Sequence, residues 1–514
     1  MNGAQALIRT LVNSGVDVCF ANPGTSEMHF VAALDRVEGM RCVLGLFEGV
    51  VTGAADGYYR MKGSPASTLL HLGPGLANGL ANLHNAKKAN SGIVNIVGQH
   101  ATYHIEYNAP LTSDIEGLAR PMSAWVRTSP DAKSVARDGA AAIAAAKSSP
   151  PQIATLILPA DTAWREADGV AEVAAEAQRP GYSPQAVENA ARVLHGGEAT
   201  LLLLTGGALT EPALTLAAQI AGKTGCKVMG QTYNPRMARG RGRFSIDRIP
   251  YVIEQALPIL KDFRHIILVE TNDPVAFFAY PNKPSMLKPE GCEVHRMTAN
   301  GEDSVAALEA LAAAVGAKPQ DARPQKLVEI AKPTGALTHA SIAQAIAMAI
   351  PENAIVVDES ITTGRGFFPT TAAAAPHDWL QNMGGSIGFS TPVATGAAVA
   401  CPDRKVICMV GDGSAMYTLQ SLWTMAREGL AITTLIFANG TYNILRGELT
   451  NVGVRNPGPR AVDMLSIGRP DLDWVSLARG MGVEAARAKT CDQLVKALGA
   501  GLRSEGPYLI EVAL

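Results

Sequence analysis

The alternation of short β-branched runs with helix-length stretches constrains this fold more than any other feature. Near the N-terminus, strand-like runs lie at residues 17–24, 40–48 and 66–75, and amphipathic stretches at 49–61 and 75–90 follow the second and third runs. The alternation is typical of βαβ units, in which helices cover both faces of a parallel sheet. It returns in the middle and in the last third of the chain, so we predict an α/β protein with three consecutive doubly wound parallel-sheet domains.

Two breaks in the pattern divide the chain of 514 residues. Residues 162–184 carry no periodic pattern, and residues 317–327 are Pro-rich and charged. Both are typical of linkers. We therefore predict an N-terminal domain at 1–165, a central domain at 185–318 and a C-terminal domain at 335–514, each of ordinary domain size.

Composition excludes several classes of protein. Lys and Arg number 44 against 46 Asp and Glu, so there is no basic surplus of the kind that nucleic-acid binding requires. No apolar run approaches the roughly 18 residues of a spanning helix, and the first ten residues do not resemble a secretory signal. We expect a cytoplasmic protein that binds neither nucleic acid nor membrane. The seven cysteines form no CxxC pair, which favours inert buried thiols over a disulfide or a cysteine zinc site.

Two common nucleotide-binding signatures are missing. No predicted domain has GxGxxG after its first strand, and GxxxxGK[ST] does not occur. A nicotinamide dehydrogenase and a P-loop NTPase are therefore disfavoured.

The sharpest motif joins two predicted strands of the C-terminal domain. One strand runs into Gly411-Asp412-Gly413, and the next ends at Asn439-Gly440-Thr441. Neighbouring parallel strands would bring Asp412 and Asn439 together at the carboxyl edge of the sheet, where such sheets bind ligands. A carboxylate, an amide oxygen and a backbone carbonyl suit Mg²⁺. A helix predicted from Ser414 would direct free N–H groups at an anion. The plainer alternative is an ordinary strand-to-helix turn followed by a hairpin turn.

With this motif the chain resembles the thiamine diphosphate (ThDP) enzymes of the acetolactate synthase, pyruvate oxidase and decarboxylase type, and most closely the benzoylformate decarboxylase group. The stretches NPGTSEMHF, EGVVTGAADGYYR, HLGPGLANGLANLHNA, GGSIGF and NGTYNILRG carry the resemblance. It implies that Asp412, Asn439 and the Thr441 carbonyl hold Mg²⁺. It further implies that ThDP is bound by Asn22, Pro23, Gly24, Asn78, Glu359, Ser360, Gly385, Ser386, Ile387, Gly411, Gly413, Ser414 and Tyr442.

Glu48 is the predicted proton-relay residue. It lies between Phe47 and Gly49-Val50-Val51, an apolar setting that raises the affinity of a carboxylate for a proton. The resemblance implies that Glu48 hydrogen-bonds the cofactor's aminopyrimidine ring and drives its tautomerisation. The alternative is a helix N-terminal acid that the helix dipole favours. The resemblance also implies that Ile387 bends the cofactor, against the alternative of plain core packing.

On the substrate side, the resemblance places Thr25 against the substrate carboxylate and makes His71 the first of two active-site histidines. A histidine at a strand's carboxyl end can exchange protons near neutral pH, although a satisfied structural histidine is the alternative. The second histidine is missing. The matching segment offers the aromatic residues Phe277, Phe278 and Tyr280, and the secondary candidates are His100 and His104.

The resemblance implies ThDP- and Mg²⁺-dependent decarboxylation of a small 2-oxo acid, through an enamine, to an aldehyde. An acetolactate synthase-like carboligase is the alternative, and a non-catalytic binding protein is disfavoured because Glu48, Asp412 and Asn439 are all present. The resemblance also implies a homodimer or homotetramer with cofactor sites between chains. The segment 446–474 is a candidate lid, in which Arg446 and Arg455 either hold the substrate or are simply exposed.

Overall fold

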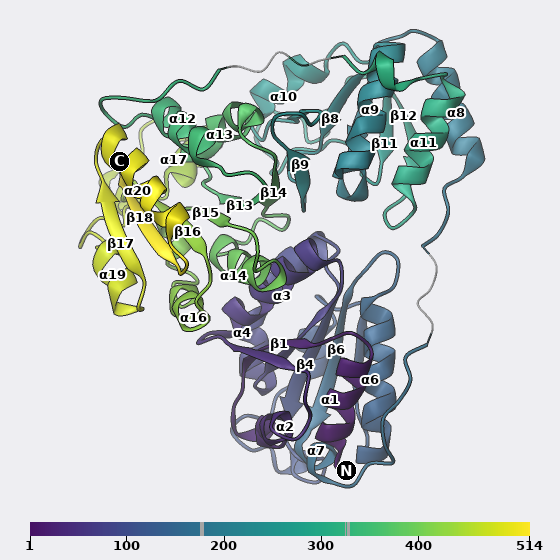
Figure 1. The fold of residues 1–514 in the computed structure, drawn as a ribbon, viewed down its shortest axis with the longest axis vertical. Coiled ribbons are helices and arrows are strands. Elements are labelled where there is room, and N and C mark those ends of the chain that lie inside the picture. The colour runs from purple at the N-terminus through teal and green to yellow at the C-terminus, as the bar shows by residue number, and fades with distance from the viewer. Residues whose placement is uncertain (175–178, 324, 326–328) are drawn as a thin grey trace.

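A computed structural model describes residues 1–174, 179–323, 325 and 329–514, and it contains three sheets with helices packed on them (Figure 1). The prediction of three consecutive α/β units is confirmed. The limits of the three domains stay a prediction, and residues 175–178, 324 and 326–328 of the two predicted linkers lie outside the described residues.

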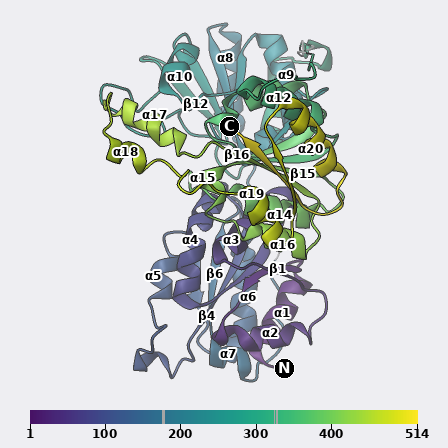
Figure 2. The same cartoon turned by 90° about the vertical axis from the view of Figure 1, so that its left-hand side faces the viewer.

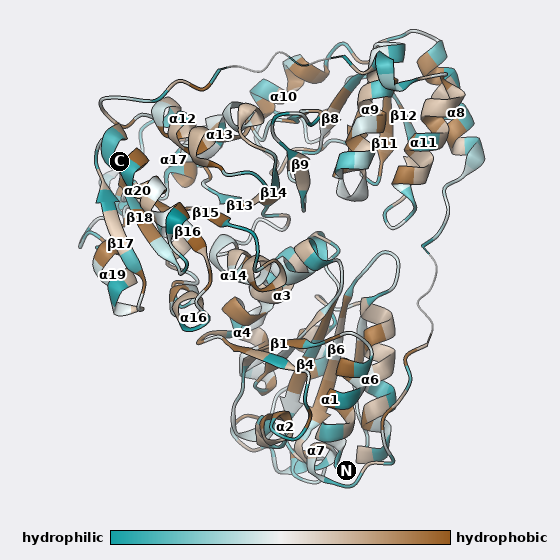
Figure 3. Cartoon of the chain, in the orientation of Figure 1, coloured by the Kyte–Doolittle hydropathy of each residue, from teal (hydrophilic) through white to brown (hydrophobic). Residues whose placement is uncertain are grey.

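The N-terminal sheet is parallel throughout, with strand order β2-β1-β3-β4-β6-β5. Its strands are β1 (Val18–Asn22), β2 (Arg41–Leu44), β3 (Ala66–Leu70), β4 (Ile93–Gln99), β5 (Trp125–Thr128) and β6 (Ile153–Pro159). The helices are α1 (Gly3–Asn13), α2 (Met28–Leu34), α3 (Glu48–Lys62), α4 (Leu72–Lys88), α5 (Ile115–Ala119), α6 (Ala132–Ala146) and α7 (Ala160–Trp164). The inner strands β3, β4 and β6 are buried along their whole length, as expected where helices cover both faces (Figure 3).

The central sheet has the order β10-β8-β7-β11-β12 and is also parallel. It consists of β7 (Thr200–Leu204), β8 (Lys227–Gly230), β10 (Asp247–Arg248), β11 (His265–Val269) and β12 (Glu293–Thr298). The helices are α8 (Pro184–His195), α9 (Glu211–Thr224), α10 (Ile253–Leu260) and α11 (Ser304–Ala314).

The C-terminal sheet has the order β17-β18-β16-β15-β13-β14-β9. Its parallel strands are β13 (Ala354–Glu359), β14 (His377–Gln381), β15 (Val406–Gly411), β16 (Ile432–Ala438), β17 (Glu484–Ala488) and β18 (Tyr508–Ala513). The helices are α12 (His339–Ala349), α13 (Phe367–Thr370), α14 (Ser390–Ala400), α15 (Asp412–Ala415), α16 (Ser421–Arg427), α17 (Asn443–Asn451), α18 (Pro459–Asp463), α19 (Trp474–Gly480) and α20 (Cys491–Arg503). The seventh strand, β9 (Met237–Arg239), comes from the middle of the chain and pairs antiparallel with β14. It ties the central unit to the C-terminal one.

The N-terminal and C-terminal units meet where α3 packs on α14 (Figure 2). Small residues allow the two backbones to approach closely. A Cβ added to Gly57 would lie 2.1 Å from the Val393 carbonyl oxygen, and one added to Gly396 would lie 1.8 Å from the Ala54 carbonyl oxygen. The glycines in the stretch EGVVTGAADGYYR therefore serve domain packing as well as the start of α3.

Two details of the predicted elements are wrong. The strand before Glu48 ends at Leu44, so Glu48 opens α3 after a three-residue loop. The helix after the GDG motif begins at Asp412 instead of Ser414 and has only four residues. Among the described residues, no helix is long and apolar enough to cross a membrane.

Candidate active site

The predicted metal residues lie together at the carboxyl edge of the C-terminal sheet. Strands β15 and β16 pair in parallel with Gly411 opposite Phe437, which brings Asp412 beside the turn at Asn439. The buried Asp412 accepts hydrogen bonds from the backbone N–H groups of Gly440 at 2.7 Å and Gly413 at 2.9 Å. Burial raises the pKa of Asp412 and these bonds oppose the rise. The carboxylate is thus fixed between both halves of the motif.

The turn after β16 is folded back on the segment that follows it. The Asn439 amide oxygen accepts from the Thr441 N–H at 3.0 Å, and the Thr441 hydroxyl donates to the Leu465 carbonyl at 2.7 Å. A Cβ on Gly413 would lie 2.4 Å from the Tyr442 ring, so only glycine fits there. The carboxylate, amide and carbonyl oxygens gathered here are the hard donors that Mg²⁺ takes, and the donor set fits that ion.

Glu359 acts on the neighbouring loop. Its buried carboxylate accepts from the backbone N–H groups of Gly388, Phe389 and Ser390 at 2.9–3.1 Å, which caps α14 and fixes the loop that carries Ile387. Burial raises the pKa of Glu359 to about 7, against the lowering effect of those bonds. The adjacent Ser360 donates to Asp358. The contacts of these two residues therefore support the loop, and a direct contact with the cofactor stays a prediction.

The loop of Ile387 is also held by asparagines of α4. Asn85 both donates to the Ser386 carbonyl at 2.9 Å and accepts from its N–H at 3.1 Å. Asn82 donates to the Gly49 carbonyl at 2.8 Å and to the Gly388 carbonyl at 3.3 Å. Helix α4 thus links the start of α3, where Glu48 lies, to the loop of Ile387 in the same chain.

Glu48 lies at the first position of α3 with 8% of its surface exposed. Asn78 donates to its Oε2 at 3.0 Å. A Cβ on Gly75 would lie 3.0 Å from Oε1, so the glycine keeps space beside that atom. Glu48 is therefore both an acid at a helix N-terminus and a buried acid. The sequence had suggested these two environments as alternatives. One carboxylate oxygen is held by Asn78, and the other is available to a ring nitrogen of a cofactor.

Glu27, which was not predicted from the sequence, also belongs to the site. Glu27, which follows Thr25 by two positions, contacts the His71 Nδ1 atom through its Oε2 at 2.8 Å and accepts from the Gly24 N–H at 2.7 Å. Burial is the largest effect on Glu27 and raises its pKa, while Gly24 and His71 lower it. A Cβ on Gly24 would lie 2.3 Å from the His71 ring. The stretch NPGTSE therefore positions His71. The feature of the sequence that could have indicated Glu27 is an acidic residue two positions after the predicted Thr25.

His71 lies at the tight junction of β3 and α4, and about a fifth of its side chain is exposed. Leu72, which follows it, has a positive φ of 46°. Such a backbone is unusual for a non-glycine residue and is found most often at functional sites. Thr25 is exposed nearby in the same N-terminal unit, and Asn22 donates to the Gly45 carbonyl at 2.7 Å.

Of the secondary histidines, His100 lies close enough to His71 to sense its charge. Burial, then His104 and His71, lower the pKa of His100. Its Nε2 atom is buried and has no hydrogen-bond partner among the described residues. The rings of His100 and His104 lie 5.3 Å apart. The structure thus gathers His71, His100 and His104 in one region of the N-terminal unit.

The aromatic segment of Phe277, Phe278 and Tyr280 reaches the loop of Ile387. Gly385 has a φ of +79°, and a Cβ there would lie 2.7 Å from the Phe277 ring. Phe277 in turn packs against Tyr233 and Tyr251. Phe278 is 53% exposed, and Tyr280 lies under Lys283. Phe277 is therefore the residue of this aromatic segment that lies beside a predicted cofactor residue, Gly385.

The candidate lid is mostly exposed and forms the short helices α17 and α18. It is anchored to the central unit by hydrogen bonds from Tyr251 to Glu448 at 3.2 Å and from Lys283 to Asn451 at 3.0 Å. Arg446 donates to Ser466 at 3.1 Å within the segment, and Arg455 is exposed. Neither arginine is shown to reach a substrate pocket, so that role stays a prediction.

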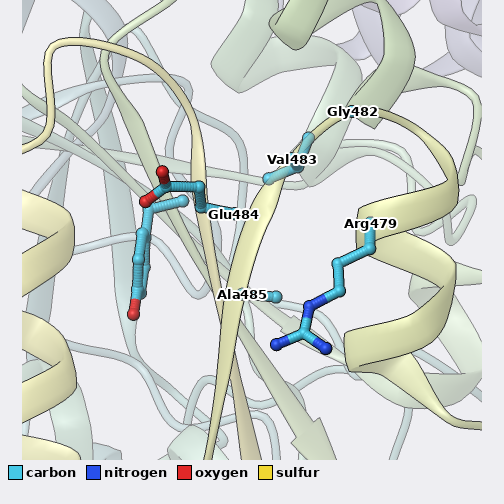
Figure 4. A pocket seen from close by; sticks show the side chains of 6 residues that line it. Arg479, Gly482, Val483, Glu484 and Ala485 are labelled. Carbon is cyan, nitrogen blue, oxygen red and sulfur yellow. The ribbon is translucent and has the colours of Figure 1, made fainter.

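A cavity of ≈ 420 Å³ lies elsewhere in the C-terminal unit, beside β17 (Figure 4). Its lining includes Arg479, Val483, Glu484 and Tyr508. None of the predicted site residues contributes to it. The candidate site is therefore defined by its side chains and not by this cavity.

Comparison with known proteins assigns the class. Residues 1–118 match the family described as thiamine pyrophosphate enzyme, N-terminal TPP binding domain, and residues 366–512 match its C-terminal TPP binding domain. The chain belongs to the thiamine pyrophosphate enzymes, and its cofactor is thiamine diphosphate. The first segment contains Glu27, Glu48 and His71, and the second contains Ile387, Asp412 and Asn439. Glu359 and Phe277 lie outside both segments.

Individual relatives differ in their reactions. The chain is 51% identical to a Mycobacterium tuberculosis protein named "putative acetolactate synthase large subunit IlvX", over 100% of this chain and 99% of that one. It is 31% identical to benzoylformate decarboxylase of Pseudomonas aeruginosa, over 99% and 98% of the two chains. A solved 4-hydroxybenzoylformate decarboxylase of Rhodococcus jostii superposes with a TM-score of 0.85 at 25% identity, over 100% and 99% of the two chains.

Proposed function

We propose that this enzyme decarboxylates a small 2-oxo acid to an aldehyde, with ThDP and Mg²⁺. The observation that supports decarboxylation is the Glu27–His71 pair, because release of an aldehyde requires a proton donor at the reacting carbon. A buried carboxylate 2.8 Å from Nδ1 stabilises the protonated imidazole and fixes its orientation. Nε2 is then the atom that delivers the proton.

In this proposal the carboxylate of Asp412, the amide oxygen of Asn439 and the carbonyl of Thr441 would hold Mg²⁺, which would neutralise negative charge on the cofactor's diphosphate. Bound ThDP supplies a nucleophilic carbon that accepts the electron pair left when CO₂ departs. Glu48 holds a proton at Oε1 while Asn78 fixes Oε2. Thr25 binds the substrate carboxylate, and Ile387 supports the cofactor on the loop that Glu359 and Asn85 fix.

Carboligation is the second candidate, and Phe277 favours it. A phenyl ring beside Gly385 cannot donate the proton that a histidine would, so protonation competes less well with attack on a second carbonyl. The 51% identical relative is named as an acetolactate synthase subunit, which agrees in kind with this candidate.

Product analysis tests both candidates. The purified enzyme, loaded with ThDP and Mg²⁺, is offered a panel of aliphatic and aromatic 2-oxo acids, and products are followed by NMR with and without an added acceptor aldehyde. We expect aldehyde as the main product without acceptor, and an added share of acyloin with it. Acyloin or acetolactate-type product alone, with no aldehyde at any acceptor concentration, would contradict the proposed release of an aldehyde and support carboligation.

The assembly is part of the proposal: a cytoplasmic homodimer, or a homotetramer as a dimer of dimers, in which Glu48 of one chain serves ThDP held by Asp412 of another. Exposed apolar side chains beside the metal loop, Met416 and Tyr417, support a covering chain. Glu48→Gln and Asp412→Ala enzymes are each expected to be inactive alone. Unfolding and refolding them together should restore up to a quarter of wild-type sites in hybrid dimers, whereas no recovery would place both residues in one chain's site.

A further inference from the structure

Two histidines and a glutamate of the central sheet lie together far from the candidate active site. His265 begins β11, and Glu293 and His295 lie on the edge strand β12. The parallel register pairs His265 with Glu293, and residues 293 and 295 share a face because side chains alternate along a strand. The three side chains therefore project from one face at the amino ends of the strands, whereas Phe277 follows the carboxyl end of β11.

The three potential ligand atoms have the spacing of a metal site. His265 Nδ1 lies 3.1 Å from His295 Nε2, and each lies 3.8 Å from Glu293 Oε2. The point equidistant from the corners of a triangle with these sides lies about 2.1 Å from each corner, which is the bond length of Zn²⁺ to histidine nitrogen and carboxylate oxygen. A metal ion would occupy this point, or one just above it, without movement of the backbone.

A second carboxylate is placed as such sites require. Glu198, which precedes β7, lies 3.0 Å from Nε2 of His265 through its Oε2. If Nε2 carries the proton and donates it to Glu198, the lone pair of Nδ1 points into the triangle. A carboxylate on the far nitrogen of a metal-binding histidine fixes the tautomer and raises the basicity of the ligand. Three residues of strands β11 and β12 and one from the turn before β7 thus converge in one arrangement.

We propose that His265, Glu293 and His295 bind a divalent transition-metal ion of the Zn²⁺ class, with Glu198 as the positioning residue. Two imidazoles and one carboxylate suit Zn²⁺ better than Mg²⁺, which prefers oxygen ligands alone. The fourth position is open to water. The ion ties the edge strand β12 to β11, and its binding stabilises the folded state in proportion to its saturation.

No local sequence pattern indicates this site, because His265 lies 28 and 30 positions before Glu293 and His295 and no cysteine takes part. The site is independent of the proposed reaction, since its residues lie at the opposite end of the central strands from Phe277. The outcome of a metal-binding test at this site therefore does not affect the assignment of the ThDP site.

Zinc titration of the full-length enzyme, freed of transition metals by a chelator and then loaded with ThDP and Mg²⁺, tests the proposal. We expect competition with a chromophoric chelator to show one Zn²⁺ equivalent, and Co²⁺ to give the intense d–d absorption of a four-coordinate site. His295→Ala and Glu293→Gln should remove that equivalent. Glu198→Gln should weaken it by about 10- to 100-fold, the usual effect of an outer partner.

The matched control is His195→Ala, which removes an exposed histidine at the end of α8 and should leave Zn²⁺ binding unchanged. Zn²⁺ should raise the Tm of wild type and of His195→Ala, but not that of His295→Ala. Absence of the Zn²⁺ equivalent in wild type, or its survival at full affinity in His295→Ala and Glu293→Gln, would overturn the proposal. Each variant's far-UV circular dichroism shows that loss of the ion is not loss of the fold.

Discussion

Replacing Glu27 by Gln separates the role of this carboxylate in proton transfer from its role in folding. The substitution keeps the size of the side chain and an oxygen that accepts the Gly24 N–H, now 2.7 Å away. It removes the negative charge that lies 2.8 Å from His71 Nδ1. We expect slower turnover, because the protonated imidazole loses its buried counter-charge.

The size of the effect follows from the contact. A hydrogen bond to a charged group contributes about 1.5–3 kcal/mol, and only 1% of the Glu27 side chain is exposed, so solvent does not screen the pair. At about 1.4 kcal/mol for each factor of ten, kcat for aldehyde release should fall by about 10- to 150-fold.

The free energy of unfolding of Glu27→Gln should not fall with its kcat. Burial raises the pKa of Glu27 in the folded state. A raised carboxyl pKa contributes stability that is present below the unfolded pKa and is lost as pH rises through the folded value. At pH 7 the buried charge is therefore unfavourable, and the neutral Gln should keep or raise the free energy of unfolding. This advantage should disappear at pH values below about 4, where Glu27 is protonated in both states.

Steady-state kinetics across pH and urea unfolding at pH 7 measure both effects in the same preparations. Glu38→Gln, at an exposed position, is the control for loss of one acidic charge. Wild-type kcat in Glu27→Gln would refute the proton-transfer reasoning. A lower kcat accompanied by a lower free energy of unfolding would show that Glu27 is a structural residue instead.

Three further predictions concern the cofactor loops and the product. Asp412→Ala should abolish Mg²⁺-dependent ThDP binding, measured by calorimetry, while the exposed Asp403→Ala should not; equal affinities would contradict the metal assignment. The pKa of Glu359 is about 7, against 4.5 for an ordinary glutamate. The free energy of unfolding of wild type should therefore fall by about 3 kcal/mol between pH 4.5 and pH 8, and urea titrations should show no such fall from this group in Glu359→Gln. Phe277→His should lower the ratio of acyloin to aldehyde by NMR, and an unchanged ratio would exclude Phe277 as the determinant.

Much of this arrangement follows from local sequence. The parallel strands are encoded as short apolar runs, and the rule that parallel strands present their carboxyl ends at one edge predicted that Asp412 and Asn439 would meet. The burial of Glu48 likewise follows from its apolar neighbours. These features depend on residues adjacent in sequence or on a general property of parallel sheets.

Other features depend on contacts that no local pattern encodes. Glu27 meets His71 across 44 positions, and Asn85 meets Ser386 across 301. The three-residue strand β9 belongs to the central part of the chain but pairs with β14 of the C-terminal unit. The hydrophobic pattern of the segment does not predict this pairing. Helix α15 begins at Asp412 and is four residues long, although the sequence predicted a helix from Ser414. Each of these depends on the packing of whole units.

The exchange of the ThDP C2 proton with solvent tests the central claim most directly, because it reports cofactor activation before any substrate is chosen. The ThDP- and Mg²⁺-loaded enzyme is mixed with D₂O and quenched in acid, and the C2 proton is followed by NMR. We predict exchange in wild type faster by orders of magnitude than in Glu48→Gln, with ThDP affinity retained in the variant, since general acid–base help is worth about 10²- to 10⁴-fold. Equal exchange rates in the two enzymes, both saturated with ThDP, would contradict the assignment of Glu48 and with it the proposed site.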